Sequence, residues 1–143
     1  MGTQERSHGP ASLLDRLVDA TNAHDLAGLI DCFAPDYRNE TPAHPARGFT
    51  GREQVRENWR QIFAFVPDIT AAIVRQAVAD DTIWSEWEMR GTRRDGSAHL
   101  MRGVIVFTVG QGRATRARFY LEPVDDSPSG VGAAVRATVG TNP

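Results

Sequence analysis

The sequence predicts an α+β fold in which helices cover one face of an antiparallel sheet. Up to residue 66, apolar residues recur at the three- and four-residue intervals that are typical of amphipathic helices. From residue 69 to residue 122 they alternate, in β-branched and aromatic segments separated by short turns. Because strands joined by hairpins form an antiparallel meander, we expect the helices to pack together on one of its faces.

The size and composition of the chain fit one domain with its own hydrophobic core. The chain has 143 residues, 41% of them hydrophobic, and a net charge of −2. A nucleic-acid or anionic-membrane surface would need a basic excess, so neither kind of partner is expected. All 16 basic residues are arginine, which rules out a lysine Schiff base. The start of the chain is polar and shows no signal peptide, so we expect a cytoplasmic protein.

Two helices are expected in the first part of the chain. Residues 1–10 are expected to form a flexible lead, and apolar residues at helical spacing predict a helix over residues 11–22. Asp25 is a suitable N-cap for a second, shorter helix, which Pro35 should end. The single cysteine, Cys32, falls on the apolar side of this second helix, where we expect a buried and unreactive thiol.

A third helix is expected after a short extended piece over residues 36–41 and a proline-rich loop over residues 41–48. Thr50 and Glu53 have the spacing of a capping box at the start of this helix. The helix carries one apolar stripe and should stop at Pro67.

Four strands in hairpin succession are expected after the third helix. The turns between them are Asp80-Asp81, Asp95-Gly96 and Gly110-Gln111-Gly112. The predicted strands span residues 69–78, 82–92, 97–109 and 113–122. Pro123 closes the domain, and residues 124–143 are expected to form a tail of low structural content because they are small and polar.

Short motifs along residues 11–123 resemble the SnoaL-like branch of the NTF2-like superfamily in their order and spacing. They include Ala23-His24-Asp25-Leu26, Asp36-Tyr37, Gly51-Arg52-Glu53, Pro67-Asp68, Arg102-Gly103-Val104 and Arg118-Phe119-Tyr120. The resemblance implies a cone fold, with three N-terminal helices packed on a curved, mostly antiparallel sheet that encloses an apolar pocket. It does not imply one reaction, because the superfamily includes isomerases, cyclases, hydrolases, dehydratases, transport factors and binding proteins.

Two acidic groups on which the family's known reactions depend are missing from this sequence. The steroid isomerases of the family use a second acid on the next-to-last strand, and the matching position here is Ile105. The family's cyclases and epoxide hydrolases carry an aspartate on the last strand, where this chain has Phe119. Both differences make the floor of the expected pocket apolar.

Glu40 is the remaining candidate for proton transfer, because relatives place an aspartate or a histidine near this point of the first strand. Alignment on the following proline would put Thr41 there instead, and strand alternation allows only one of the two side chains to point inward. A buried glutamate beside aromatic residues would have a raised pKa and could move a proton near neutral pH. The alternative is a solvated glutamate that pairs with Arg38 or Arg47.

Other polar residues of the expected pocket are His44 and Tyr37. His44 lies in the loop at the pocket rim and could act as acid or base, while Tyr37 offers a hydroxyl group. His24 is expected at the junction of two helices, and His99 is expected to be exposed near a hairpin. The histidines lack the spacing of metal ligands, so we expect neither a metal nor another cofactor.

Large apolar residues on the faces assigned inward are expected to contact a substrate, with a purely structural core as the alternative. They are Trp59, Phe63, Trp87, Met89, Met101, Ile105 and Phe119. The opposite strand faces carry mixed charges, such as Glu86 and Arg90, together with Trp84 and Tyr120. Such a face is either solvated or, because relatives often pair through this sheet, the interface of a homodimer.

These observations favour a small enzyme without a cofactor, which isomerises, cyclises or dehydrates a hydrophobic, carbonyl-bearing substrate of the polyketide or terpenoid kind. In this hypothesis the pocket shapes the substrate and excludes water, while Glu40, with His44 or Tyr37, handles the proton. Two alternatives remain open. One is a binding protein that holds an apolar small molecule without turnover, and the other is a protein–protein interaction module that uses the sheet face.

Overall fold

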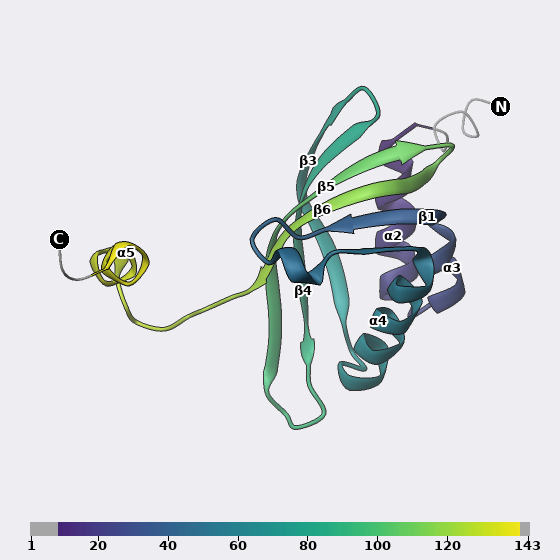
Figure 1. Cartoon of the computed structure of the whole chain (residues 1–143). Helices are drawn as coiled ribbons and strands as arrows, with labels where there is room; N and C mark the ends of the chain where they lie inside the picture. Colours follow the sequence, from purple (N-terminus) through teal and green to yellow (C-terminus); the bar gives the residue numbers. More distant parts are fainter. Residues whose placement is uncertain (1–8, 141–143) are drawn as a thin grey trace.

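The computed structural model describes residues 9–140, which form a six-stranded sheet with helices packed on one face (Figure 1). The strand order is β2-β1-β6-β5-β4-β3, and β1 and β6 form the one parallel pair among these strands. The predicted α+β fold, with helices on a mostly antiparallel sheet, is therefore confirmed. Residues 1–8 of the predicted flexible lead lie outside the described residues. No helix within residues 9–140 is long and apolar enough to cross a membrane.

The first predicted helix is confirmed as α2 (Ala11–Asn22), and its apolar side joins the core through Leu13, Leu14 and Leu17. Asn22 fastens the end of this helix to the edge strand β3 (Thr70–Ala79). Its amide nitrogen donates a hydrogen bond to the Ala71 carbonyl over 3.1 Å, and its amide oxygen accepts one from the Ala71 N–H over 2.7 Å. These paired hydrogen bonds hold the helix against the sheet at the far edge from β2.

The second helix, α3 (Leu26–Asp31), is shorter than the sequence predicts. Asp25 caps it as expected, because its carboxylate accepts a hydrogen bond from the Gly28 N–H over 3.0 Å. The prediction that Pro35 ends this helix is wrong, since Pro35 lies inside strand β1 (Phe33–Glu40). The strand tolerates a residue without an N–H because its pairing with β6 shifts register between Phe33 and Arg38.

The third helix, α4 (Arg52–Phe65), forms as predicted, but the predicted capping box at its start does not. Thr50 belongs to the short strand β2 (Phe49–Thr50), and the cap residue is Gly51, which has a φ of 97° and makes no side-chain cap bond. The Gly51 N–H instead donates to the Tyr37 carbonyl over 2.6 Å. Sheet pairing therefore takes the threonine away from the helix. The loop before β2 contains a short 3₁₀ helix, η1 (Pro45–Arg47).

The four predicted strands are confirmed within one or two residues. They are β3, β4 (Thr82–Thr92), β5 (Ala98–Gly110) and β6 (Arg113–Pro123). The predicted inward face of β4 is also confirmed, because Ile83, Ser85, Trp87 and Met89 are all buried. Alternation along each strand therefore separates a face toward the helices from an outer face.

Residues 124–143, which the sequence predicts to have little regular structure, contain a helix, α5 (Val131–Val139). None of its residues is buried. Figure 1 shows α5 well apart from the sheet, at the end of an extended segment that continues from β6. The division of the chain into a lead, one domain over residues 11–123 and a tail stays a prediction.

Gly103 is expected to be essential for the sheet, because β6 passes too close to it for any side chain. A Cβ atom at Gly103 would lie 2.1 Å from the Tyr120 carbonyl oxygen, and its φ of 150° is one that other residues rarely adopt. We expect Gly103→Ala to lower the free energy of unfolding by on the order of 3 kcal/mol. Gly130→Ala is the control, since a Cβ there meets nothing within 4 Å. Equal urea midpoints for the two variants would contradict this account.

Candidate functional site

A cavity of about 320 Å³ lies between helix α4 and the inner face of the sheet. Its wall is mostly apolar and includes four of the predicted substrate-contacting residues, Trp59, Met89, Met101 and Phe119. Phe49 and Leu121 also line it, one from the short edge strand and the other from the end of β6. Five strands (β1, β2, β4, β5 and β6) and helix α4 therefore contribute side chains to a single, mostly apolar space.

The other three predicted substrate-contacting residues, Phe63, Trp87 and Ile105, do not line this cavity. Trp87 and Ile105 are each only 2% exposed and belong to the solid core. The Trp87 indole N–H donates to the Ser85 hydroxyl over 2.8 Å, which in turn donates to the Ile105 carbonyl over 2.6 Å. Phe63 stacks on His24 with 5.0 Å between ring centroids. The seven residues thus divide between the cavity wall and the interior of the domain, and their contact with a substrate stays a prediction.

A hydrogen-bonded chain of three side chains from β1 and the residue after it forms the polar part of the cavity. The Tyr37 hydroxyl donates to the Asn39 amide oxygen over 2.7 Å, and the Asn39 amide nitrogen donates to the Thr41 hydroxyl over 3.4 Å. Tyr37 is 1% exposed, and burial raises its pKa well above the usual value for tyrosine. The phenol therefore stays protonated and fixes the orientation of the Asn39 amide.

The structure places Thr41, not Glu40, in the cavity. Tyr37, Asn39 and Thr41 alternate with Arg38 and Glu40, so the charged side chains lie on the other side of the strand. Glu40 therefore does not line the cavity in which we expected it to transfer a proton.

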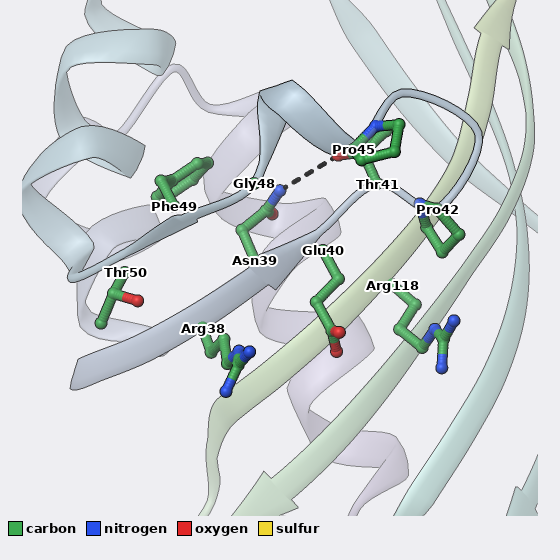
Figure 2. Close-up of a pocket in the computed structure, with 10 residues that line it drawn as sticks. All are labelled: Arg38, Asn39, Glu40, Thr41, Pro42, Pro45, Gly48, Phe49, Thr50 and Arg118. Carbon is green, nitrogen blue, oxygen red and sulfur yellow. Dashed lines mark hydrogen bonds between the residues drawn. The ribbon is translucent and has the colours of Figure 1, made fainter.

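Glu40 instead lines a neighbouring outer concavity of about 430 Å³, which shares Asn39, Thr41 and Phe49 with the cavity. Figure 2 shows Arg38, Glu40 and Arg118 extending side by side there from neighbouring strands. The Glu40 carboxylate lies 3.4 Å from the Arg116 guanidinium, so its ion pair is with neither arginine named by the sequence analysis. The outer concavity is thus polar and charged, unlike the cavity beneath the helices.

The structure places His44 and His99 differently from the sequence-based expectation. His44 does not line the cavity; its Nε2 atom lies 2.5 Å from the Glu122 carboxylate. His99, which was expected to be exposed, is half-buried and lines the cavity. Burial, with a smaller contribution from the Arg93 charge, lowers the pKa of its imidazole below the usual value. At neutral pH His99 is therefore an uncharged base.

Sequence reasoning missed His99 and Asn39, although a signal for each was present. His99 stands two residues before Met101 on the same strand, so alternation places both on one face. Asn39 stands in the same way between Tyr37 and Thr41. Exposed polar residues at the mouth of the cavity, Arg47 and Asn58, were also missed.

The residues that line the cavity carry hydroxyls, amides, one indole N–H, one imidazole and one guanidinium, without a carboxylate. Within residues 9–140, no cluster of three or more His, Cys, Asp or Glu side chains is arranged to hold a metal ion. Such a set can donate hydrogen bonds to a ligand oxygen and accept a proton on the imidazole.

The family of the chain follows from its sequence and agrees with this architecture. Residues 14–117 match the model of the SnoaL-like domain, so the chain belongs to the SnoaL-like family. Among curated protein sequences, none matches this chain.

Several solved structures share the fold. Wild-type IdmH of Streptomyces antibioticus, described as a candidate polyketide cyclase, is 24% identical, with a TM-score of 0.70 over 80% of this chain and 93% of its own. RV0760c of Mycobacterium tuberculosis, in complex with estradiol-17beta-hemisuccinate, is 20% identical, with a TM-score of 0.68 over 79% of this chain and 93% of its own. An LEH-like epoxide hydrolase of M. tuberculosis is 16% identical, with a TM-score of 0.68 over 79% of this chain and 82% of its own.

The Tyr37 hydroxyl is expected to stabilise the fold as well as orient the Asn39 amide in the cavity. Tyr37→Phe leaves the buried Asn39 amide oxygen without its donor, so the free energy of unfolding should fall by about 1–3 kcal/mol. Tyr120→Phe is the matched control, because Tyr120 lies 43% exposed on the outer face. Urea unfolding of both variants checks the prediction, and an equal effect of the two substitutions would contradict it.

Proposed function

We propose that this chain is a cofactor-independent enzyme that isomerises, cyclises or dehydrates a hydrophobic, carbonyl-bearing small molecule of the polyketide or terpenoid kind. The observation that carries the proposal is an apolar cavity of about 320 Å³ with oriented, uncharged hydrogen-bond donors at one part of its wall. This volume lies at the small end of the range for small-molecule sites. The substrate's hydrocarbon body would pack against Trp59, Met101 and Phe119.

The donors suit a carbonyl oxygen. Because Tyr37 donates to the Asn39 amide oxygen, the amide nitrogen of Asn39 must face Thr41, and one of its two N–H groups remains for a ligand. The Thr41 oxygen accepts from Asn39, which leaves the Thr41 O–H free to donate. Two fixed donors at one oxygen would stabilise the negative charge that develops when a carbonyl compound enolises.

His99 replaces Glu40 in the proton-transfer step of this proposal. The imidazole is the one group lining the cavity whose pKa lies near the working range of a general base, and its lowered pKa keeps it neutral at pH 7. It would take a proton from the carbon next to the carbonyl and return it at another position of the same substrate. No external oxidant or reductant is needed for such a transfer.

The relatives support the substrate class but not a particular reaction. IdmH is described as a candidate polyketide cyclase, and RV0760c holds a steroid derivative, so the shared fold accommodates bulky apolar molecules. A binding protein without turnover is the second candidate. The absence of a carboxylate from the cavity wall favours it, because proton transfer then depends on His99 alone.

The first experiment is native mass spectrometry of the purified protein, followed by identification of the small molecules that it releases. A hydrophobic compound with a carbonyl group is expected. Chemical conversion of that compound by the protein would support the enzyme, and tight binding without conversion would favour the binding protein. Co-purified compounds that all lack an oxygen acceptor would contradict the role given to Asn39 and Thr41.

The affinity for the ligand should depend on Thr41, which lines the cavity, and not on the preceding residue, Glu40. Thr41→Val removes one hydrogen-bond donor, and we expect the dissociation constant of the identified ligand to rise about 3–10-fold. Glu40→Gln is the matched control and should leave the dissociation constant unchanged, because Glu40 lies on the outer side of the strand. Isothermal titration calorimetry measures the dissociation constants of both variants. A larger effect of Glu40→Gln than of Thr41→Val would favour Glu40 as the functional residue of the site.

Turnover should depend on His99 in its neutral form. We expect His99→Gln to lower kcat at least about 100-fold while the dissociation constant of the substrate changes little, since general-base catalysis contributes about 100-fold or more. In the unsubstituted protein, kcat/KM should rise with pH and level off above the pKa of His99, which burial places below the usual value for histidine. Unchanged turnover in His99→Gln would exclude the imidazole as the base.

A further inference from the structure

Arg47 carries the one permanent charge among the described residues that line the cavity. An ion pair with Glu40 was one possibility for it, but Glu40 lies on the other side of β1 and pairs with Arg116. Within residues 9–140, no group forms an ion pair or a hydrogen bond with the Arg47 guanidinium. In contrast, Arg52 at the start of α4 donates to the Phe33 carbonyl over 3.2 Å. The Arg47 side chain is therefore free to bind a ligand.

The loop that carries Arg47 is held in place by its own backbone and by a contact with β6. Arg47 is the last residue of η1, and its N–H donates to the His44 carbonyl over 2.9 Å. The Gly48 N–H donates to the Pro45 carbonyl over 3.2 Å. The His44 ring lies 2.5 Å from the carboxylate of Glu122 on β6, which ties the loop to the sheet. The backbone of Arg47 is thus already ordered at the cavity, which lowers the entropy cost of binding a ligand there.

Asn58 on helix α4 offers a second donor at the mouth of the cavity. Its amide oxygen accepts a hydrogen bond from the Gln54 side chain over 2.8 Å, so its amide nitrogen keeps both N–H groups for a ligand. Asn58 and Arg47 both line the cavity and are both exposed, so they mark the place where it opens to solvent. An anion at this opening would meet donors from two separate elements.

Donors at the edge of an apolar space favour a ligand with a carboxylate at one end. The planar guanidinium of Arg47 matches the two oxygens of a carboxylate, and a single cation matches a single negative charge. Among the described residues that line the cavity, none is acidic, so none competes for Arg47. The apolar wall would exclude the charge itself, because an unpaired carboxylate is very costly to bury. Such a ligand would therefore place its apolar body inside and its carboxylate at the mouth.

We propose that the ligand of this cavity is an amphipathic organic acid, whose carbonyl-bearing apolar body fills the cavity and whose carboxylate binds Arg47 and Asn58. The substrate class of the proposed function, on which this assignment rests, is thereby narrowed to carbonyl compounds that carry a free carboxylate. Arg47 is then a residue that determines specificity, and it takes no part in the proton transfer assigned to His99.

Matched pairs of probes test whether the cavity prefers an acid. The probes are three phenyl keto acids, in which two, three or four methylene groups separate the ketone from the carboxylate, and the methyl ester of each acid. Isothermal titration calorimetry at low ionic strength gives their dissociation constants. We expect at least one acid to bind about 5–20-fold more tightly than its own ester, because hydrogen bonds to a charged group are stronger than neutral ones. High salt should reduce this preference without weakening the ester.

Three variants test whether Arg47 and Asn58 cause the preference. Arg47→Gln should raise the dissociation constant of the preferred acid to about that of its ester, and leave the ester unchanged. Arg38→Gln is the matched control, since Arg38 is also exposed but lines the outer concavity and not the cavity. Asn58→Asp puts a negative charge at the mouth and should weaken the acid but not the ester. All three positions are exposed, so the substitutions should leave the fold intact.

Three other outcomes would overturn the role of Arg47, and they can be told apart. If every acid binds only as tightly as its ester, the carboxylate is not recognised, while the proposed function stands because it needs only an apolar ketone. If Arg47→Gln and Arg38→Gln weaken the acid equally, the acid responds to the overall positive charge or binds outside the cavity. If neither the acids nor the esters bind, the proposed function is itself contradicted, and the role of Arg47 falls with it.

Discussion

The parallel pairing of β1 with β6 is the constraint on which the rest of the structure depends. It joins the first long strand to the last, although Arg38 and its sheet partner Arg116 are separated by most of the domain. The pairing leaves β1 between β2 and β6 and brings the end of β1 beside Phe119 on β6. The polar chain of Tyr37, Asn39 and Thr41 and the apolar wall from β5 and β6 then line a single cavity.

The two-residue period of β1 decides the chemistry of both sides of this strand. Uncharged donors face the helices, whereas Arg38 and Glu40 face outward beside Arg116 and Arg118. A shift of one residue would put the carboxylate into an apolar cavity and the amide of Asn39 into solvent. Burial of the Tyr37 hydroxyl with its acceptor opposes such a shift, because an unpaired buried amide oxygen is costly. The same side chains thus hold the register and orient the proposed ligand.

Local sequence signals were sufficient where no distant segment competed for the same residues. The bounds of α2, the Asp25 cap and the alternation of β4 were predicted correctly because each depends on neighbours within a few positions. The signals failed where sheet pairing took priority. Thr50 has the spacing of a helix cap, yet its backbone pairs with Arg38 in the sheet. Two of the seven predicted substrate-contacting residues, Trp87 and Ile105, belong to the solid core, because alternation tells which side a residue faces but not what fills the space there.

The sequence by itself determined the fold class, through the periodicity of its apolar residues, and the family, through the match of residues 14–117 to the SnoaL-like domain. It also predicted that the wall of the cavity is mostly apolar. Only the tertiary structure decided that Thr41 rather than Glu40 faces inward, that His99 lines the cavity and that His44 pairs with Glu122. The physical reason is that each of these outcomes depends on the register between strands far apart in the chain, and on which side chains the helices leave uncovered.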